Sequence, residues 1–250
     1  MNALDYVSVE EAQGLPGLRV AFTQGVPGPW GFGARAILEH KQIPFVAVPQ
    51  IAGEVNEALL RWTGQASAPV AVYGDERPRA SWSEIILLAE RLAPEPRLIP
   101  ADAAQRAEMF GLCHELCAED GLGSSVRAML FHLRNRDPRS LLVKRYETGR
   151  DVAYARSRAQ AVIAMLAARL QAQAARGVPY LVGEALSAAD FYATGFSHLL
   201  RGFPVEVCEM PDSYRATGDL VRQALGETPE ILFTHRDRIL RDHVRCPFRF

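Results

Sequence analysis

Two short segments, fourteen residues apart, have the chemistry to hold a small peptide. The first, Ala68-Pro69-Val70, places a proline at the start of a predicted strand, where its ring cannot donate a hydrogen bond to a neighbouring strand. X–Pro bonds adopt the cis form at little cost. A cis bond here would turn the main-chain groups of Ala68 outward, where an extended peptide can pair with them as another strand would.

The second segment, Ser83-Glu84, lies in the first turn of the helix predicted next. Main-chain N–H groups at such a position lack helical partners, and the helix dipole is positive there, so both favour a carboxylate ligand. Together the two segments predict one site for the middle and the acidic end of a small peptide.

The cysteines predict neither a disulfide framework nor a metal site. The chain has four of them, and no C-x-x-C pair occurs. Cys113-His114-x-x-Cys117 has no second ligand pair at zinc-finger spacing, and adjacent helical residues point in different directions. We interpret these cysteines as buried apolar thiols and expect a reducing compartment and no metal.

The elements that must position these residues alternate over the first 92 residues. After an irregular leader, hydrophobic periodicity predicts strands over 18–23, 43–48 and 69–73, a short edge strand near 77–80, and helices over 30–41, 54–62 and 81–92. This pattern is typical of a small mixed sheet covered by helices.

Residues 93–100 contain three prolines and predict an exposed, fairly stiff connector. Beyond the connector the pattern is helical, with predicted helices over 102–119, 125–134, 149–176, 187–200, 219–225 and 229–242. The predicted organisation is therefore an α/β domain over 1–92, a linker over 93–100 and an all-helical domain over 101–250.

Composition narrows the classes of partner. The 250 residues are 48% hydrophobic and 23% charged, as in ordinary globular proteins. A net charge of −1 gives no broad positive field for nucleic acid. No run of about 18 apolar residues occurs without a charge, and residues 1–11 do not resemble a secretion signal. We expect a cytoplasmic protein that binds neither nucleic acid nor membrane.

In their order and spacing, these segments resemble the glutathione transferase family over nearly the whole chain. Residues 18–41 look like the first strand, loop and helix of the family. Ala68-Pro69-Val70 is similar to its cis-proline motif, and Ser83-Glu84-Ile85-Ile86 is similar to the segment that receives the γ-glutamyl carboxylate. The most recognisable segment is Tyr180 to Asp190, where we expect Ser187 and Asp190 to cap a helix.

The resemblance implies a thioredoxin-like N-terminal domain that binds glutathione and an all-helical C-terminal domain that lines the site of a small electrophile. It also implies a homodimer. Carried onto this sequence, the expected glutathione-binding residues are Ala68, Pro69, Trp82, Ser83 and Glu84. Trp82 is a departure, because the family commonly has an acidic or amide residue there.

The position that activates the thiol departs further. Gly31 stands where the family has a serine or cysteine, and Phe22 stands where other members have a tyrosine; neither side chain can donate a hydrogen bond to a thiolate. We expect the main-chain N–H groups at the start of the helix beginning near Gly31 to replace the hydroxyl, with Thr23 as the alternative. Trp30 is either a wall of the site or a hydrophobic plug.

The leading functional hypothesis is therefore a detoxifying transferase that conjugates glutathione to a small hydrophobic electrophile or processes such a molecule with it. Two alternatives remain. One is a binding or structural protein that keeps this fold without turnover, because Gly31 and Phe22 carry no activating group. The other is a lyase, isomerase or dehalogenase that uses glutathione as a cofactor.

Overall fold

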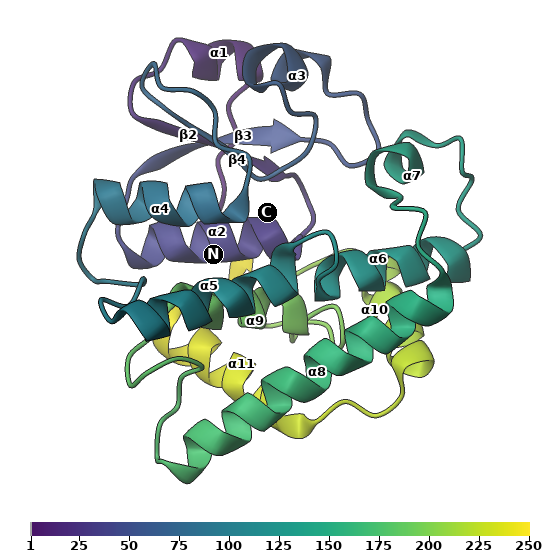
Figure 1. The fold of residues 1–250 in the computed structure, drawn as a ribbon. Coiled ribbons are helices and arrows are strands. Elements are labelled where there is room, and N and C mark those ends of the chain that lie inside the picture. Colours follow the sequence, from purple (N-terminus) through teal and green to yellow (C-terminus); the bar gives the residue numbers. More distant parts are fainter. Residues whose placement is uncertain (1) are drawn as a thin grey trace.

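A three-stranded mixed sheet forms the first part of the structure, a computed structural model that describes residues 2–250 (Figure 1). Its strands are β2 (Leu18–Thr23), β3 (Phe45–Gln50) and β4 (Val70–Tyr73). The central strand, β2, pairs in parallel with β3 and in antiparallel with β4. The predicted edge strand over 77–80 is reduced to one bridge between Ala71 and Arg79.

Alternation along β2 explains why helices cover both faces of the sheet. Val20 and Phe22 point into the main core, whereas Ala21 points into a second, smaller core. Figure 1 shows the corresponding layers, with one helix pair on each side of the strands. Helices α2 (Pro29–His40) and α4 (Trp82–Leu92) cover the main-core face, and α1 (Val9–Gln13) and α3 (Glu57–Thr63) cover the other.

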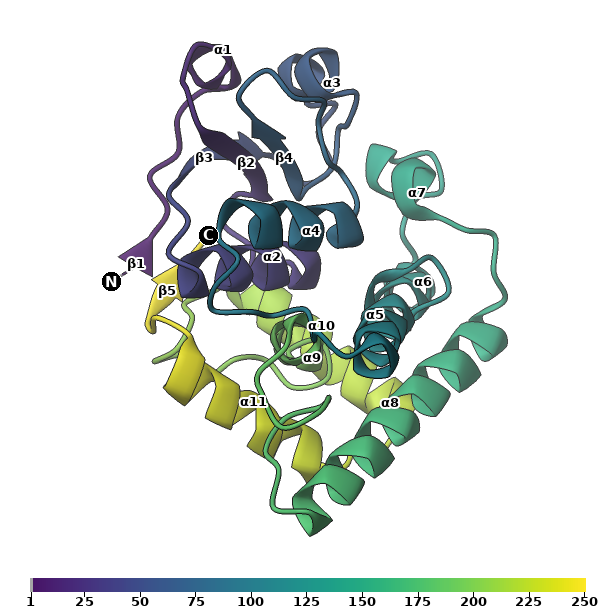
Figure 2. The ribbon, with the colours of Figure 1, turned by 60° about the vertical axis from the view of Figure 1, so that its left-hand side comes forward.

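The remainder of the chain is almost entirely helical, so the predicted fold class is confirmed as an α/β unit followed by an all-helical one (Figure 2). Its helices are α5 (Ala103–Cys117), α6 (Leu122–Leu133), α7 (Leu141–Tyr146), α8 (Val152–Ala175), α9 (Ala188–Ser197), α10 (Asp212–Leu225) and α11 (Glu230–His243). Among the described residues, no helix is both long and apolar enough to cross a bilayer.

The predicted cap of α9 is confirmed. The main-chain N–H of Ser187 donates to Asp190 Oδ2 at 2.9 Å, and the N–H of Leu181 donates to Asp190 Oδ1 at 2.8 Å. Burial raises the pKa of the Asp190 carboxyl, and nearby His235 opposes that shift. This polar cluster orients the segment that leads into α9, the central helix of the helical part.

Glycines allow α9 to pack closely against α2. A methyl group on Gly33 of α2 would lie 2.5 Å from the ring of Tyr192 in α9. A methyl group on Gly195 of α9 would lie 2.9 Å from the ring of Phe32 in α2. Both separations are too short for any side chain, so the two halves of the molecule meet across glycine contacts.

The prediction of an irregular leader was wrong in part, and two further elements were not predicted. The leader is partly ordered, because Ser8 caps α1 by accepting a hydrogen bond from the N–H of Glu11. The segment between α6 and α8 contains the short helix α7. At the other end of the chain, β5 (Phe248–Arg249) pairs in parallel with β1 (Asn2–Ala3), which brings the two ends together (Figure 2).

Candidate functional site

Two adjoining cavities lie where the sheet domain meets the helical part. The first has a volume of about 230 Å³ and mostly apolar walls, drawn from β2, α2, α6, α7, α10 and the chain end. The second has a volume of about 550 Å³ and carries more polar groups. We call them the apolar and the polar cavity. They share four wall residues, which are Trp30, Ala68, Arg127 and Tyr146.

The segment before β4 forms part of both walls. The Ala68–Pro69 bond is cis, as the resemblance to the cis-proline motif implied. Ser67, Ala68 and Pro69 line the polar cavity, and Ala68 also lines the apolar one. The pairing of Val70 with Ala21 on β2 anchors β4 directly behind this segment. Ala68 therefore stands at the junction of the two cavities.

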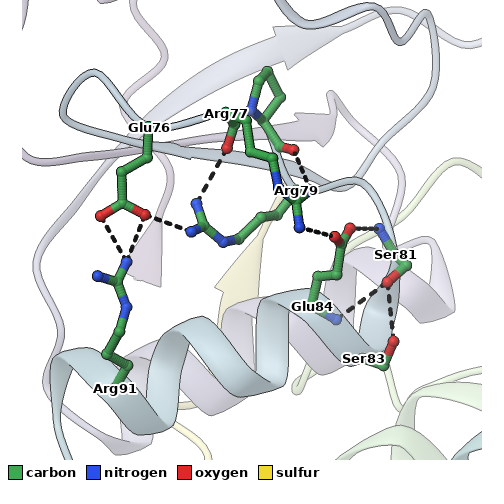
Figure 3. A network of polar contacts seen from close by, with 8 residues as sticks. Glu76, Arg77, Arg79, Ser81, Ser83, Glu84 and Arg91 are labelled. Carbon is green, nitrogen blue, oxygen red and sulfur yellow. Dashed lines mark hydrogen bonds and ion pairs between the residues drawn. The ribbon is translucent and has the colours of Figure 1, made fainter.

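The start of α4 is a capping box (Figure 3). Ser81 Oγ accepts a hydrogen bond from the N–H of Glu84 at 3.1 Å, and Glu84 Oε2 accepts one from the N–H of Ser81 at 3.4 Å. Arg77 pairs with the same carboxylate at 2.7 Å and lowers its pKa. Glu84 was predicted to bind glutathione, but its main-chain N–H and its carboxylate are both already engaged within the protein.

Ser83 and Trp82 point in different directions. The hydroxyl oxygen of Ser83 lies 3.0 Å from that of Ser81 and is partly exposed, so it can still meet a ligand at the helix start (Figure 3). The indole of Trp82 packs against the rings of Phe110 and Tyr192, with centroid separations of 6.2 and 6.4 Å. Trp82 also lines the polar cavity, where it contributes an apolar wall.

The start of α2 faces the apolar cavity with two unpaired N–H groups. Gly28 donates its N–H to Val26, and Pro29 has none. The N–H of Phe32 bonds to Gly28 and those of later residues belong to the helix, which corrects the prediction that the N–H groups from Gly31 to Ala34 are all free. Within residues 2–250, the N–H groups without a hydrogen bond here are those of Trp30 and Gly31.

Thr23, the alternative hydroxyl, lines the same cavity but is already a donor. Its Oγ1 donates to Gln50 Oε1 at 2.8 Å, and the Gln50 amide in turn donates to Ile51. This chain of hydrogen bonds leaves Thr23 no second proton to offer a thiolate. The arrangement favours the main chain of α2 over Thr23.

Trp30 is both a wall and a structural side chain. Its ring lines both cavities, while Nε1 donates to the main-chain oxygen of Cys117 at 2.9 Å. The ring packs edge-on against Phe196 at 4.9 Å. Gly123 of α6 makes room for it, since a methyl group there would collide with the indole. The two readings left open for Trp30 therefore both apply.

Three wall residues could not be found from the sequence. Phe250 lines the apolar cavity, packs against Phe22 at 5.9 Å and accepts a hydrogen bond from the N–H of Gly25 at 2.8 Å. Arg127 and Tyr146 belong to α6 and α7. The sequence around Arg127 predicts a helix but no binding site, and the sequence around Tyr146 indicates neither. Only the tertiary arrangement brings these three residues into one cavity wall with Ala68.

The cysteines offer no reactive group to the cavities. All four are free, and burial raises the pKa of the Cys113 and Cys117 thiols. Burial raises the pKa of Cys208 to about 11. Low thiolate content makes buried thiols inert. Over residues 2–250, no group of three or more metal-ligating side chains gathers in one place.

Similarity to known proteins appears in three dimensions only. No protein-family profile matches the chain, and no curated protein matches its sequence. A glutathione S-transferase from Methylobacterium radiotolerans, solved with glutathione sulfonate, is 20% identical, with 91% of this chain and 94% of that one covered and a TM-score of 0.64.

Two other solved structures agree. A glutathione transferase family member from Pseudomonas fluorescens with two glutathione molecules bound is 17% identical, with coverage of 94% and 95% and a TM-score of 0.63. A glutathione S-transferase from Methylobacillus flagellatus with glutathione bound is 13% identical, with coverage of 92% and 96% and a TM-score of 0.65. The chain has the glutathione transferase fold, a thioredoxin-like domain followed by an all-helical one.

Proposed function

We propose that this protein binds glutathione in the polar cavity and presents its sulfur to a small hydrophobic electrophile in the apolar one. The observation that carries the proposal is the position of Ala68, which lines both cavities. A tripeptide paired with this segment would direct its central residue toward the apolar cavity. The glutathione named with several solved structures of this fold supports the same ligand.

In this proposal the start of α2 favours the thiolate. A free thiol has a pKa near 8.5, so most of it is protonated at neutral pH. Trp30 and Gly31 line the apolar cavity, and their unpaired N–H groups would provide partial positive charge for an anion there. With an aryl halide, the thiolate would form a carbon–sulfur bond, halide would leave, and the thiol proton would pass to solvent.

Ser83 is the residue proposed for the γ-glutamyl carboxylate. It lies in the first turn of α4, where its hydroxyl is partly exposed. Glu84 is omitted from the proposed binding set because its carboxylate and its N–H are engaged with Ser81 and Arg77. Trp82 is retained as an apolar wall of the polar cavity.

The test combines calorimetric titration with glutathione and an assay with a generic aryl halide. Saturable glutathione binding together with conjugate formation supports the proposal. Absence of glutathione binding would overturn it.

A second candidate function is glutathione binding without turnover. It is favoured by one observation: the side chains at both expected activating positions are unable to donate, because Gly31 has none and Phe22 is a fully buried ring. Binding in calorimetry with no conjugate above the uncatalysed rate would select this candidate.

The proposal also includes a cytoplasmic homodimer with domains at 1–92 and 101–250. The arrangement is the one that the glutathione transferase resemblance implies. Light scattering on the purified protein measures the dimer directly: a mass near twice 27.6 kDa is expected, and a mass of one chain would refute it.

A further inference from the structure

Arg127 of α6 stands at the junction of the two cavities. It is partly buried and lines both of them. Its guanidinium carbon lies 4.5 Å from the ring centroid of Trp30 and 4.3 Å from that of Tyr146. These two rings fix the side chain through cation–π contacts and leave its polar edge as the part that can meet a ligand.

No anion of the protein neutralises this guanidinium. Within the described part of the chain, Arg127 forms neither an ion pair nor a hydrogen bond, whereas Arg150 and Arg158 both pair with Asp120. Burial lowers the pKa of Arg127, and the nearby phenols of Tyr146 and Tyr214 oppose that shift. An arginine nevertheless stays charged in proteins, and a charge removed from water without a partner is costly.

The two cavities differ in the charge that surrounds Arg127. Among the described residues that line the apolar cavity, Arg127 is the sole charged side chain, and hydroxyls of Tyr146, Tyr214 and Thr217 accompany it. The charged side chains that line the polar cavity are of both signs, Glu119 and Glu147 beside Arg127 and Arg145. The apolar cavity therefore combines apolar walls with one uncompensated positive charge.

We infer that the apolar cavity selects molecules with an aromatic or other apolar body and one carboxylate or sulfonate, which Arg127 binds through its planar guanidinium. This inference deepens the proposed function by naming the class of its second substrate. The binding itself needs no glutathione, because the apolar walls and Arg127 are both provided by the protein.

Two fluorescent probes with the same aromatic skeleton test it, the anionic anilinonaphthalenesulfonate and the uncharged phenylnaphthylamine. Each is titrated in the absence of glutathione into the wild type, Arg127→Met, Arg127→Lys and the control Arg145→Met. Arg145 lines the polar cavity but not the apolar one. Circular dichroism spectra establish that each variant is folded.

Arg127→Met is expected to lower the affinity for the sulfonate probe roughly ten- to hundredfold, as for loss of a hydrogen bond to a charged group. The affinity for the uncharged probe should change by less than about threefold. Arg127→Lys retains part of the preference, and Arg145→Met leaves both affinities unchanged. Equal losses for both probes would show that Arg127 only holds the wall in place and would overturn the inference, as would an unchanged sulfonate affinity.

A measurement on the wild type covers the case in which Arg127→Met does not fold. Benzoate and benzyl alcohol, which differ in the acid group, compete against the bound sulfonate probe. Benzoate should displace it at about tenfold lower concentration, and equal potency of the alcohol would contradict the inference. Glutathione binding is measured separately, so its failure would overturn the proposed function while these probe results would still stand.

Discussion

Gly31 faces the ring of Phe22 across a gap that a side chain can fill. A methyl group on Gly31 would lie 3.6 Å from Phe22 Cδ1 and 3.8 Å from the ring of Phe250, which is ordinary van der Waals contact. The position at which the glutathione transferase resemblance implies a serine or cysteine therefore has room for a side chain in this chain.

Gly31→Ser should strengthen thiol activation. The added hydroxyl can donate to the glutathione sulfur, and a hydrogen bond to a charged group is worth about 1.5–3 kcal/mol, or about one to two units of thiol pKa. We expect roughly a tenfold rise in kcat/KM with an aryl halide at neutral pH and an earlier rise in the pH–rate profile. Gly31→Ala is the control, because it adds the carbon without the donor. Equal profiles for the two variants would contradict thiol activation from this position.

Ser83→Ala should weaken the binding of glutathione while leaving the fold intact. Loss of a hydrogen bond to a carboxylate costs about 1.5–3 kcal/mol, which is roughly ten- to hundredfold in affinity by calorimetry. The neighbouring Ser81→Ala is the matched variant. It removes the cap of α4 and should lower the free energy of unfolding by about 1 kcal/mol. Unchanged affinity in Ser83→Ala would remove Ser83 from the proposed site.

Gly33→Ala should destabilise the contact between the two halves of the protein. The added methyl would lie 2.5 Å from the Tyr192 ring, and overpacking of this kind costs about 1–3 kcal/mol. Gly111→Ala in α5 is the control, since its position is exposed and no atom lies within 4 Å. That change should stabilise the helix by about 0.5–1 kcal/mol. Denaturant unfolding measures the free energy of unfolding of both variants. Similar values for Gly33→Ala and Gly111→Ala would argue against close packing between α2 and α9.

Acid should destabilise the protein through His198. Its ring is buried, stacks on Phe203 at 4.9 Å, and burial lowers its pKa to about 4. In the unfolded chain this histidine takes up a proton near pH 6.5. Above that pH, the contribution of the neutral ring to the free energy of unfolding is therefore at its full value. It falls as the pH approaches 4, by about 3 kcal/mol at most.

His198→Phe keeps a ring in this place and removes the titration. Its free energy of unfolding, measured by denaturant between pH 7 and pH 4, should fall less than that of the wild type. The exposed His132→Gln serves as the control and should follow the wild-type curve. A His198→Phe curve parallel to the wild type would show that other groups cause the acid sensitivity.

Local patterns were sufficient for most of the fold. The strand over 18–23 and the cap at Ser187 depend on residues close in sequence, so periodicity and capping rules predicted both. Helix α10 shows the limit: it was predicted to begin at Asp219 but begins at Asp212. Its first turns are polar and have little apolar periodicity, whereas the packing of α10 against α6 and α8 is a tertiary feature.

The candidate site divides in the same way. Ala68 and Pro69 could be selected because Ala68-Pro69-Val70 resembles a motif that is local in sequence, and both residues line the polar cavity. Arg127, Tyr146 and Phe250 could not be, because each reaches the cavities from a distant segment through tertiary packing. The engagement of Glu84 was readable in part, because Ser81-x-x-Glu84 is a local capping-box pattern, whereas the ion pair with Arg77 depends on how the preceding turn folds.

The double position of Trp30 has a practical consequence. Trp30 lines both cavities and Trp82 lines the polar one, whereas Trp62 lies on α3, beneath Arg19 and on the opposite side of the sheet. Any molecule that enters either cavity replaces water beside the Trp30 ring. The intrinsic emission of the protein thus provides a label-free signal of occupancy, built into the natural sequence.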